Sequence, residues 1–95
     1  MKNIIFHILL ADDDEGDRLL FKEALEELKI KYVVHTVNNG VQLLEYLTKE
    51  NAILPHLLFL DLNMPRKNGF ECLSAIKQDA TLKTLPVVIL SEGWA

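Results

Sequence analysis

The middle of the chain holds an apolar run that ends in a carboxylate: Leu57-Leu58-Phe59-Leu60-Asp61-Leu62-Asn63-Met64-Pro65. A short apolar run bounded by Pro55 and Pro65 is typical of a buried strand in a parallel sheet. Asp61 would then lie at the carboxyl end of that strand, the edge at which open α/β sheets bind ligands. Aspartate is also a common turn residue. Taken alone, the run leaves open whether Asp61 is functional or only ends the strand.

Three consecutive aspartates, Asp12, Asp13 and Asp14, follow a second apolar run at residues 4–11. If strands 4–11 and 57–61 are neighbours, their carboxyl ends bring Asp12, Asp13 and Asp61 together. Carboxylates held this close repel one another, and a hard divalent cation with oxygen ligands relieves the repulsion. The pattern predicts a site for Mg²⁺, or Mn²⁺, beside a carboxylate that can attack a phosphoryl group.

Helix capping offers another role for part of this cluster. Asp14 is expected to cap the following helix, with Asp17 as the acidic residue three positions later. Capping does not account for three aspartates directly behind a buried strand.

The remaining sequence alternates strand-like and helix-like segments. Strands are expected at residues 4–11, 31–37, 57–61 and 87–90, and helices at residues 15–29, 41–50 and 70–78. This alternation, with short loops, predicts parallel strands joined by right-handed crossovers and helices on both faces. We therefore expect an α/β fold, a three-layer doubly wound parallel sheet.

Composition excludes several classes of function. The 95 residues allow one domain with a modest core, and the net charge of −4 provides no basic field for nucleic acid or an anionic membrane. No run approaches the roughly 20 apolar residues of a membrane span, and His7 interrupts the first apolar run, unlike a signal peptide. The single cysteine, Cys72, favours a reducing compartment. A cytoplasmic protein is predicted.

Four motifs in order resemble the receiver domain of bacterial two-component response regulators, of the chemotaxis type. They are Leu9-Leu10-Ala11-Asp12-Asp13-Asp14, Leu60-Asp61-Leu62-Asn63-Met64-Pro65, Asn68-Gly69 and Pro86-Val87-Val88-Ile89-Leu90-Ser91. Each motif is weak alone, but their order and spacing are specific, and the resemblance extends from Ile4 to Ser91. It implies a flavodoxin-like sheet with strand order 2-1-3-4 and a single-domain regulator without a fused output domain.

The resemblance also implies the chemistry of the site. Asp61 would be the phosphoacceptor, loaded from a phosphohistidine of a sensor histidine kinase or phosphotransfer protein. Asp12 and Asp13 would belong to the Mg²⁺ site, with Asp13, Asp61 and the backbone carbonyl of Asn63 as direct ligands. Ser91 lies where the family carries a hydroxyl that moves toward the phosphoryl group. The chain would act as a signalling switch, with self-catalysed phosphotransfer and dephosphorylation, and not as an enzyme.

The sequence departs from the family pattern after residue 91. The last helix, lysine-bearing strand and final helix of a complete receiver have no counterpart, so we expect an incomplete receiver domain at residues 1–91 and a non-family tail at residues 92–95. We interpret the chain as C-terminally truncated. Strand 87–90 would form an exposed apolar edge, which predicts a homodimer or a domain swap.

Two other functions remain open. Asp12 and Asp14 match the D-x-D pattern of aspartate-nucleophile phosphohydrolases, although no further motif of that class follows and the chain has no room for a substrate cap. The other alternative is an interaction module with the receiver fold that is not phosphorylated, because the absent lysine contacts the phosphoryl group in the family. Turnover of small phosphate esters distinguishes the first alternative.

Overall fold

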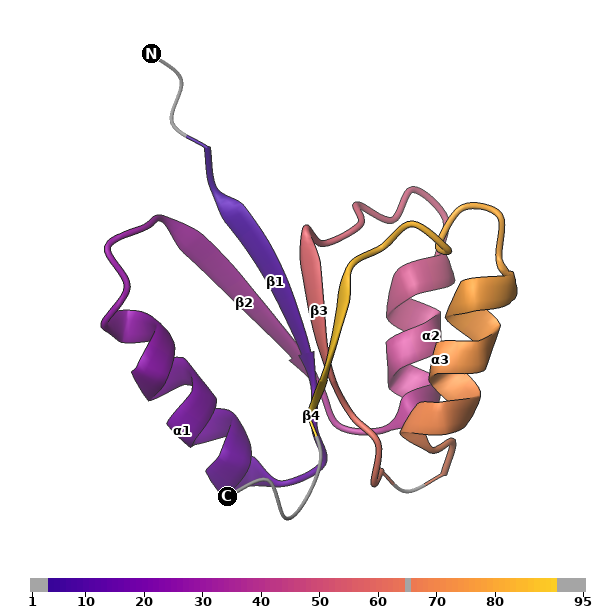
Figure 1. Cartoon of the computed structure of the whole chain (residues 1–95), viewed down its shortest axis with the longest axis horizontal. Coiled ribbons are helices and arrows are strands. Elements are labelled where there is room, and N and C mark those ends of the chain that lie inside the picture. Colours follow the sequence, from indigo (N-terminus) through magenta and orange to yellow (C-terminus); the bar gives the residue numbers. More distant parts are fainter. Residues whose placement is uncertain (1–3, 65, 91–95) are drawn as a thin grey trace.

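The structure, a computed structural model, describes residues 4–64 and 66–90. Strands and helices alternate along the chain (Figure 1), in the order β1 (Phe6–Ala11), α1 (Glu15–Glu26), β2 (Tyr32–Val37), α2 (Gly40–Thr48), β3 (Leu57–Asp61), α3 (Gly69–Gln78) and β4 (Val87–Leu90). The predicted strands 57–61 and 87–90 are confirmed residue for residue. Ser91 and the tail at residues 92–95 lie outside the described residues, so the predictions made for them stay predictions.

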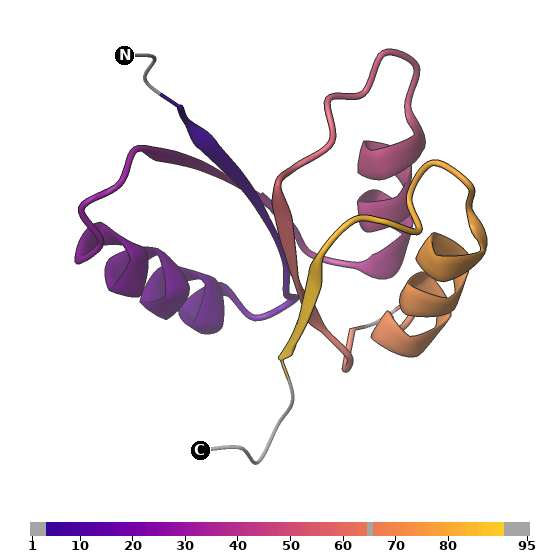
Figure 2. The same cartoon turned by 45° about the horizontal axis from the view of Figure 1, so that its top comes forward.

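The strands form one parallel sheet with the order β2-β1-β3-β4, as predicted. Helix α1 lies on one side of the sheet, and α2 and α3 lie together on the other (Figures 1 and 2). The predicted three-layer α/β architecture is therefore confirmed. Ala11 pairs with both Val37 and Leu60, so β1 and β2 end level with each other and β3 ends one residue later, at Asp61.

The main core lies between the sheet and the pair α2 and α3. Its fully buried side chains include Leu9, Leu43, Leu58, Leu60, Cys72 and Ile76. Successive side chains of a strand point to opposite faces, so Leu58 and Leu60 enter this core while Phe59 and Asp61 lie on the α1 side. Phe59 packs there edge-on against Phe21 of α1, with ring centroids 4.7 Å apart. Asp61 thus faces the gap beside α1, at the carboxyl edge of the sheet.

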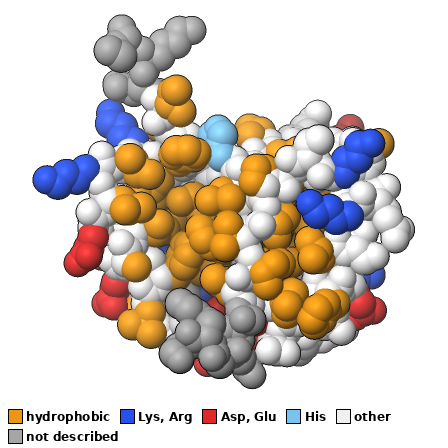
Figure 3. All heavy atoms as spheres, viewed as in Figure 1, with side chains coloured by type: hydrophobic (Ala, Val, Ile, Leu, Met, Phe, Trp, Pro, Cys, Tyr) orange, Lys and Arg blue, Asp and Glu red, His pale blue; other side chains and the backbone are white. Residues whose placement is uncertain are grey.

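The α1 side of the sheet carries much exposed apolar surface. Leu20 of α1 is 64% exposed there, and Val88 of β4, which is paired with Phe59, is 39% exposed. Strand β4 pairs only with β3 among the described strands, and its Ile89, on the opposite face of the sheet, is 40% exposed. Figure 3 shows apolar side chains gathered over the middle of the face that it views. The expected exposed edge strand is therefore present. In the described part of the chain, no helix has the length and apolar character needed to span a membrane.

Candidate functional site

Three carboxylates converge at the carboxyl edge of the sheet. Asp12 and Asp13 directly follow β1, and Asp61 is the last residue of β3. Because Ala11 is level with Leu60 in the sheet, the next residues of the two chains, Asp12 and Asp61, lie side by side. One carboxylate oxygen from each of the three residues lies within 4.8 Å of the others. The structure thus brings together the three residues that the sequence predicted to meet.

The three carboxylates differ in their surroundings. Asp12 is 5% exposed and Asp61 9%, whereas Asp13 is open to solvent. Burial raises the pKa of Asp12 from its ordinary value of 3.8 to about 6, and the nearby negative charge of Asp61 acts in the same direction. A hydrogen bond from the backbone N–H of Asp14 partly opposes this effect. Without a cation, the ionised cluster is therefore electrostatically unfavourable.

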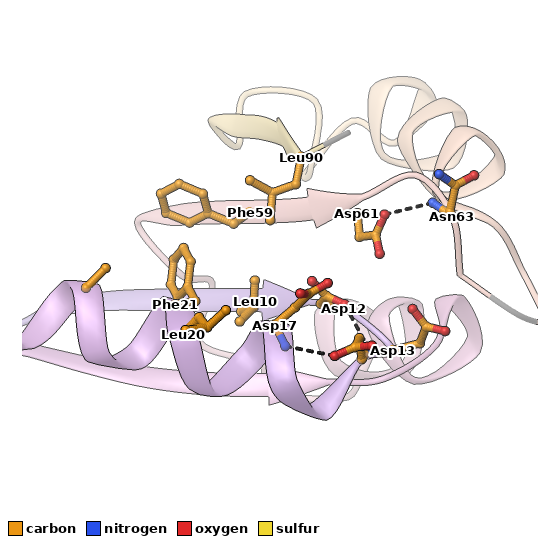
Figure 4. Close-up of a pocket in the computed structure, with 12 residues that line it drawn as sticks. Leu10, Asp12, Asp13, Asp17, Leu20, Phe21, Phe59, Asp61, Asn63 and Leu90 are labelled. Carbon is orange, nitrogen blue, oxygen red and sulfur yellow. Dashed lines mark hydrogen bonds between the residues drawn. The ribbon is translucent and has the colours of Figure 1, made fainter. Parts of the chain in front are cut away.

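The third aspartate of the run has a separate role. Asp14 caps α1, because its Oδ1 accepts a hydrogen bond of 2.8 Å from the backbone N–H of Asp17. Its own N–H donates to Oδ1 of Asp12 at 2.9 Å (Figure 4). The predicted cap is therefore confirmed. The first two aspartates of the run lie near Asp61, and the third caps the helix.

The loop after β3 is held close to Asp61 by short-range contacts. The backbone N–H of Asn63 donates to Oδ1 of Asp61 at 2.9 Å (Figure 4). The N–H of Gly69 donates to the carbonyl of Leu62 at 3.1 Å. A Cβ atom on Gly69 would lie 2.4 Å from the Cα of Leu62 and 2.5 Å from the carbonyl oxygen of Asp61. Only glycine allows this approach, and Asn68 then caps α3 in a capping box with Glu71. The Asn68-Gly69 motif therefore fixes the return of the chain beside Asp61.

A cleft of about 710 Å³ extends from the carboxylates between α1 and the sheet. One end is acidic, and the rest is apolar, lined by Leu10, Leu20, Phe21, Ala24, Phe59 and Leu90. Figure 4 shows Asp12, Asp13 and Asp61 pointing into the same space, with Asn63 on the far side of Asp61. The sequence analysis did not predict the apolar part of this cleft, because it depends on how α1 packs on the sheet.

The donor set fits a hard divalent cation. Ligand oxygens on opposite sides of a magnesium ion lie about 4 Å apart, since each Mg–O bond is about 2.0–2.1 Å, and the three carboxylate oxygens lie within 4.8 Å of one another. All three donors are carboxylate oxygens, the ligand type that such cations prefer.

A comparison with family models identifies the class of protein. The model of the response regulator receiver domain matches residues 8–94. The chain therefore belongs to the response regulator receiver domain family, and the predicted resemblance is confirmed. The matched range includes residues 92–94, which the sequence analysis assigned to a non-family tail.

Individual relatives agree with this assignment. The response regulator Rcp1 of Synechocystis sp. is 38% identical over 90 residues, which cover 90% of this chain and 61% of Rcp1. The crystal structure of the phosphorylated cyanobacterial phytochrome response regulator RcpA is 41% identical, with a TM-score of 0.89, over 97% of this chain and 69% of RcpA. The Mn²⁺-bound form of Rcp1 is 34% identical, with a TM-score of 0.88, over 95% of this chain and 68% of that one. The chain spans about three fifths of the length of the curated relatives that it matches first.

Proposed function

We propose that this chain is a phosphoacceptor switch of a two-component system, which takes a phosphoryl group onto Asp61 with the help of Mg²⁺. The observation that carries the proposal is the position of Asp61, 9% exposed and within 4.8 Å of two further carboxylates at the carboxyl edge of the sheet. The similarity to a phosphorylated response regulator and to a Mn²⁺-bound one supports it.

Asp61 acts as the nucleophile in this proposal. Its Oδ1 accepts a hydrogen bond from Asn63, so we assign the attack on phosphorus to Oδ2. The oxygen–phosphorus bond of an acyl phosphate forms, the phosphorus–nitrogen bond of the donor phosphohistidine breaks, and the imidazole leaves as the neutral base after taking up a proton. Water later attacks phosphorus, which restores the carboxylate and releases phosphate. Catalysis rests on the placement of these groups.

Further residues contribute through charge and hydrogen bonding. Asp12, Asp13, Asp61 and the backbone carbonyl of Asn63 would hold Mg²⁺, which offsets negative charge on the transferring phosphoryl oxygens when bound. The hydroxyl of Ser91 would donate a hydrogen bond to a phosphoryl oxygen. The added charge at Asp61 would then change the packing of a nearby surface, which is how the signal leaves the domain.

The partner in this scheme is a sensor histidine kinase or a phosphotransfer protein. We infer that transfer takes place in the cytoplasm and that the chain modifies only itself. Against the phosphohydrolase alternative, Oδ1 of Asp14 caps α1 and Asp14 is not among the three clustered carboxylates. The second aspartate of the D-x-D pattern is therefore engaged elsewhere.

Self-association through β4 is a separate part of the proposal. The strand Val87–Leu90 is uncharged, pairs on one side only among the described strands, and leaves Val88 and Ile89 exposed. Such edges pair with other chains, so a homodimer or a domain swap is expected. Sedimentation should give a dimer mass for the parent chain and a monomer mass for Val88→Lys. A parent chain that is monomeric and unfolds cooperatively would contradict this part.

Intact-mass spectrometry after incubation with Mg²⁺ and phosphoramidate tests the proposed chemistry. The parent chain should gain one phosphoryl group, and Asp61→Asn should gain none. Asp79→Asn is a matched control, because Asp79 lies outside the cluster and an asparagine can still accept the hydrogen bonds from Thr81 and Leu82. A chelator should abolish the adduct. No adduct on a folded parent chain would favour the interaction module, and turnover of phosphate esters would favour the phosphohydrolase.

A further inference from the structure

Arg18 makes an unusual contact for a cation beside an acidic cluster. From the first turns of α1, its Nη1 donates a hydrogen bond of 2.8 Å to the backbone carbonyl of Asp12. The side chain is half-buried, and the bond spans six residues of sequence. Arg18 thus ties the helix back to the loop that carries the candidate metal ligands.

The bonded carbonyl belongs to the peptide that joins Asp12 to Asp13. Asp12 is also held at its N–H, which donates to the carbonyl of Val37 at 3.1 Å, and at Oδ1, which accepts from Asp14. The contact with Arg18 fixes the backbone carbonyl of this residue as well, and therefore the plane of the following peptide. Asp13 is exposed, so the direction of its carboxylate depends on the backbone that presents it.

We propose that Arg18 is a positioning residue for the cation site: it holds the Asp12–Asp13 peptide so that both carboxylates face Asp61. This inference rests on the proposed function, since it assumes that the cluster binds a divalent cation. Partners that orient metal ligands in this way typically contribute 10–100-fold to metal affinity. Arg18 acts through the backbone of Asp12 and does not itself touch the cation.

The sign of the effect separates positioning from simple electrostatics. A guanidinium near a cation site repels the cation, so removal of its charge alone should tighten metal binding. If the hydrogen bond to Asp12 dominates, removal of Arg18 should weaken binding instead. The two accounts predict changes in opposite directions for the same variant.

Isothermal titration of the full chain with Mg²⁺ tests the proposal on the parent chain, Arg18→Met, Arg18→Lys and Lys22→Met. Lys22 is exposed on the same helix, so Lys22→Met is matched in the charge that it removes but leaves the contact intact. We expect Arg18→Met to weaken Mg²⁺ binding about tenfold or more, Arg18→Lys to recover part of that loss, and Lys22→Met to bind at least as tightly as the parent. Amide exchange of the metal-free chain should be faster at Asp13 and Asp14 in Arg18→Met.

Several outcomes would overturn the inference. If the parent chain binds Mg²⁺ and a folded Arg18→Met binds equally or more tightly, Arg18 does not position the site, although the proposed function stands. If Arg18→Met does not fold, Arg18→Lys decides, because unchanged affinity and unchanged amide exchange in that variant would contradict the role of the guanidinium contact. A folded parent chain that does not bind Mg²⁺ would overturn both this inference and the proposed function.

Discussion

Replacing Asp12 with asparagine removes one negative charge from the acidic cluster while keeping its shape. Asparagine Oδ1 can still accept the hydrogen bond that the N–H of Asp14 donates to Asp12. The variant therefore changes mainly the electrostatics of the site. In the absence of metal we expect Asp12→Asn to be more stable than the parent chain at neutral pH.

The magnitude follows from the pKa of Asp12, which burial raises from 3.8 to about 6. The folded chain binds this proton more tightly than the unfolded chain, so the contribution of Asp12 to stability is greatest below about pH 4 and falls as the pH rises to about 6. Each pH unit of pKa difference corresponds to about 1.4 kcal/mol. Ionised Asp12 therefore costs the folded state up to about 3 kcal/mol at pH 7.5 and about half of that at pH 5.

Urea unfolding in the presence of a chelator, followed by circular dichroism at pH 7.5 and pH 5, measures this effect. Asp12→Asn should gain stability at pH 7.5, and the gain should shrink by about half at pH 5. Glu23→Gln, which removes the same charge from an exposed position of α1, is the control and should show neither effect. Saturating Mg²⁺ should reduce the gain, because bound metal stabilises the folded state and the parent chain offers it one more carboxylate than Asp12→Asn does. Equal stability of Asp12→Asn and the parent at pH 7.5 without metal would refute the reasoning.

Substitutions at three further positions test the surroundings of the site by urea unfolding. Gly69→Ala should destabilise the chain by about 1–3 kcal/mol, because its Cβ would lie 2.4 Å from the Cα of Leu62; a neutral effect would contradict the close approach. Asn68→Ala should cost about 1 kcal/mol through loss of the α3 cap, whereas Asn68→Asp should cost less. Leu58→Ala should cost about 2–5 kcal/mol, since Leu58 is fully buried, and a cost below 1 kcal/mol would argue against the core described above.

The sequence was sufficient to predict the sheet and its acidic edge. Strands β3 and β4 were predicted residue for residue, because each is a short apolar run that follows a proline or a polar turn. Asp12 and Asp61 could be placed together because parallel strands end at one edge of the sheet. That inference needed only the order of the strands, which the family resemblance supplied.

Element ends and long side-chain contacts could not be predicted in the same way. The first strand was expected from residue 4, but Ile4 is 74% exposed and β2, the partner strand, begins only at Tyr32, opposite Phe6. The first helix was expected to reach residue 29 because Leu28 continues the apolar spacing, yet Leu28 is 49% exposed and α1 ends at Glu26. In both cases the apolar residues of the pattern continue past the point where a neighbouring strand or helix could bury them.

The contact of Arg18 with Asp12 depends on the path of the loop between β1 and α1, which no periodicity encodes. A cation one turn into the helix behind a run of aspartates is the pattern that could have indicated it. The apolar half of the cleft, where Phe21 meets Phe59, likewise depends on how α1 packs against the sheet.

The most direct test of the central claim is to locate the phosphoryl group. After incubation with phosphoramidate and Mg²⁺, borohydride reduction converts an aspartyl phosphate to homoserine, and peptide mass spectrometry then identifies the position. The account predicts homoserine at Asp61 alone, with Asp12, Asp13 and Asp14 unchanged. Homoserine at one of these three aspartates, or a phosphoryl group that resists reduction because it is on a hydroxyl, would contradict it.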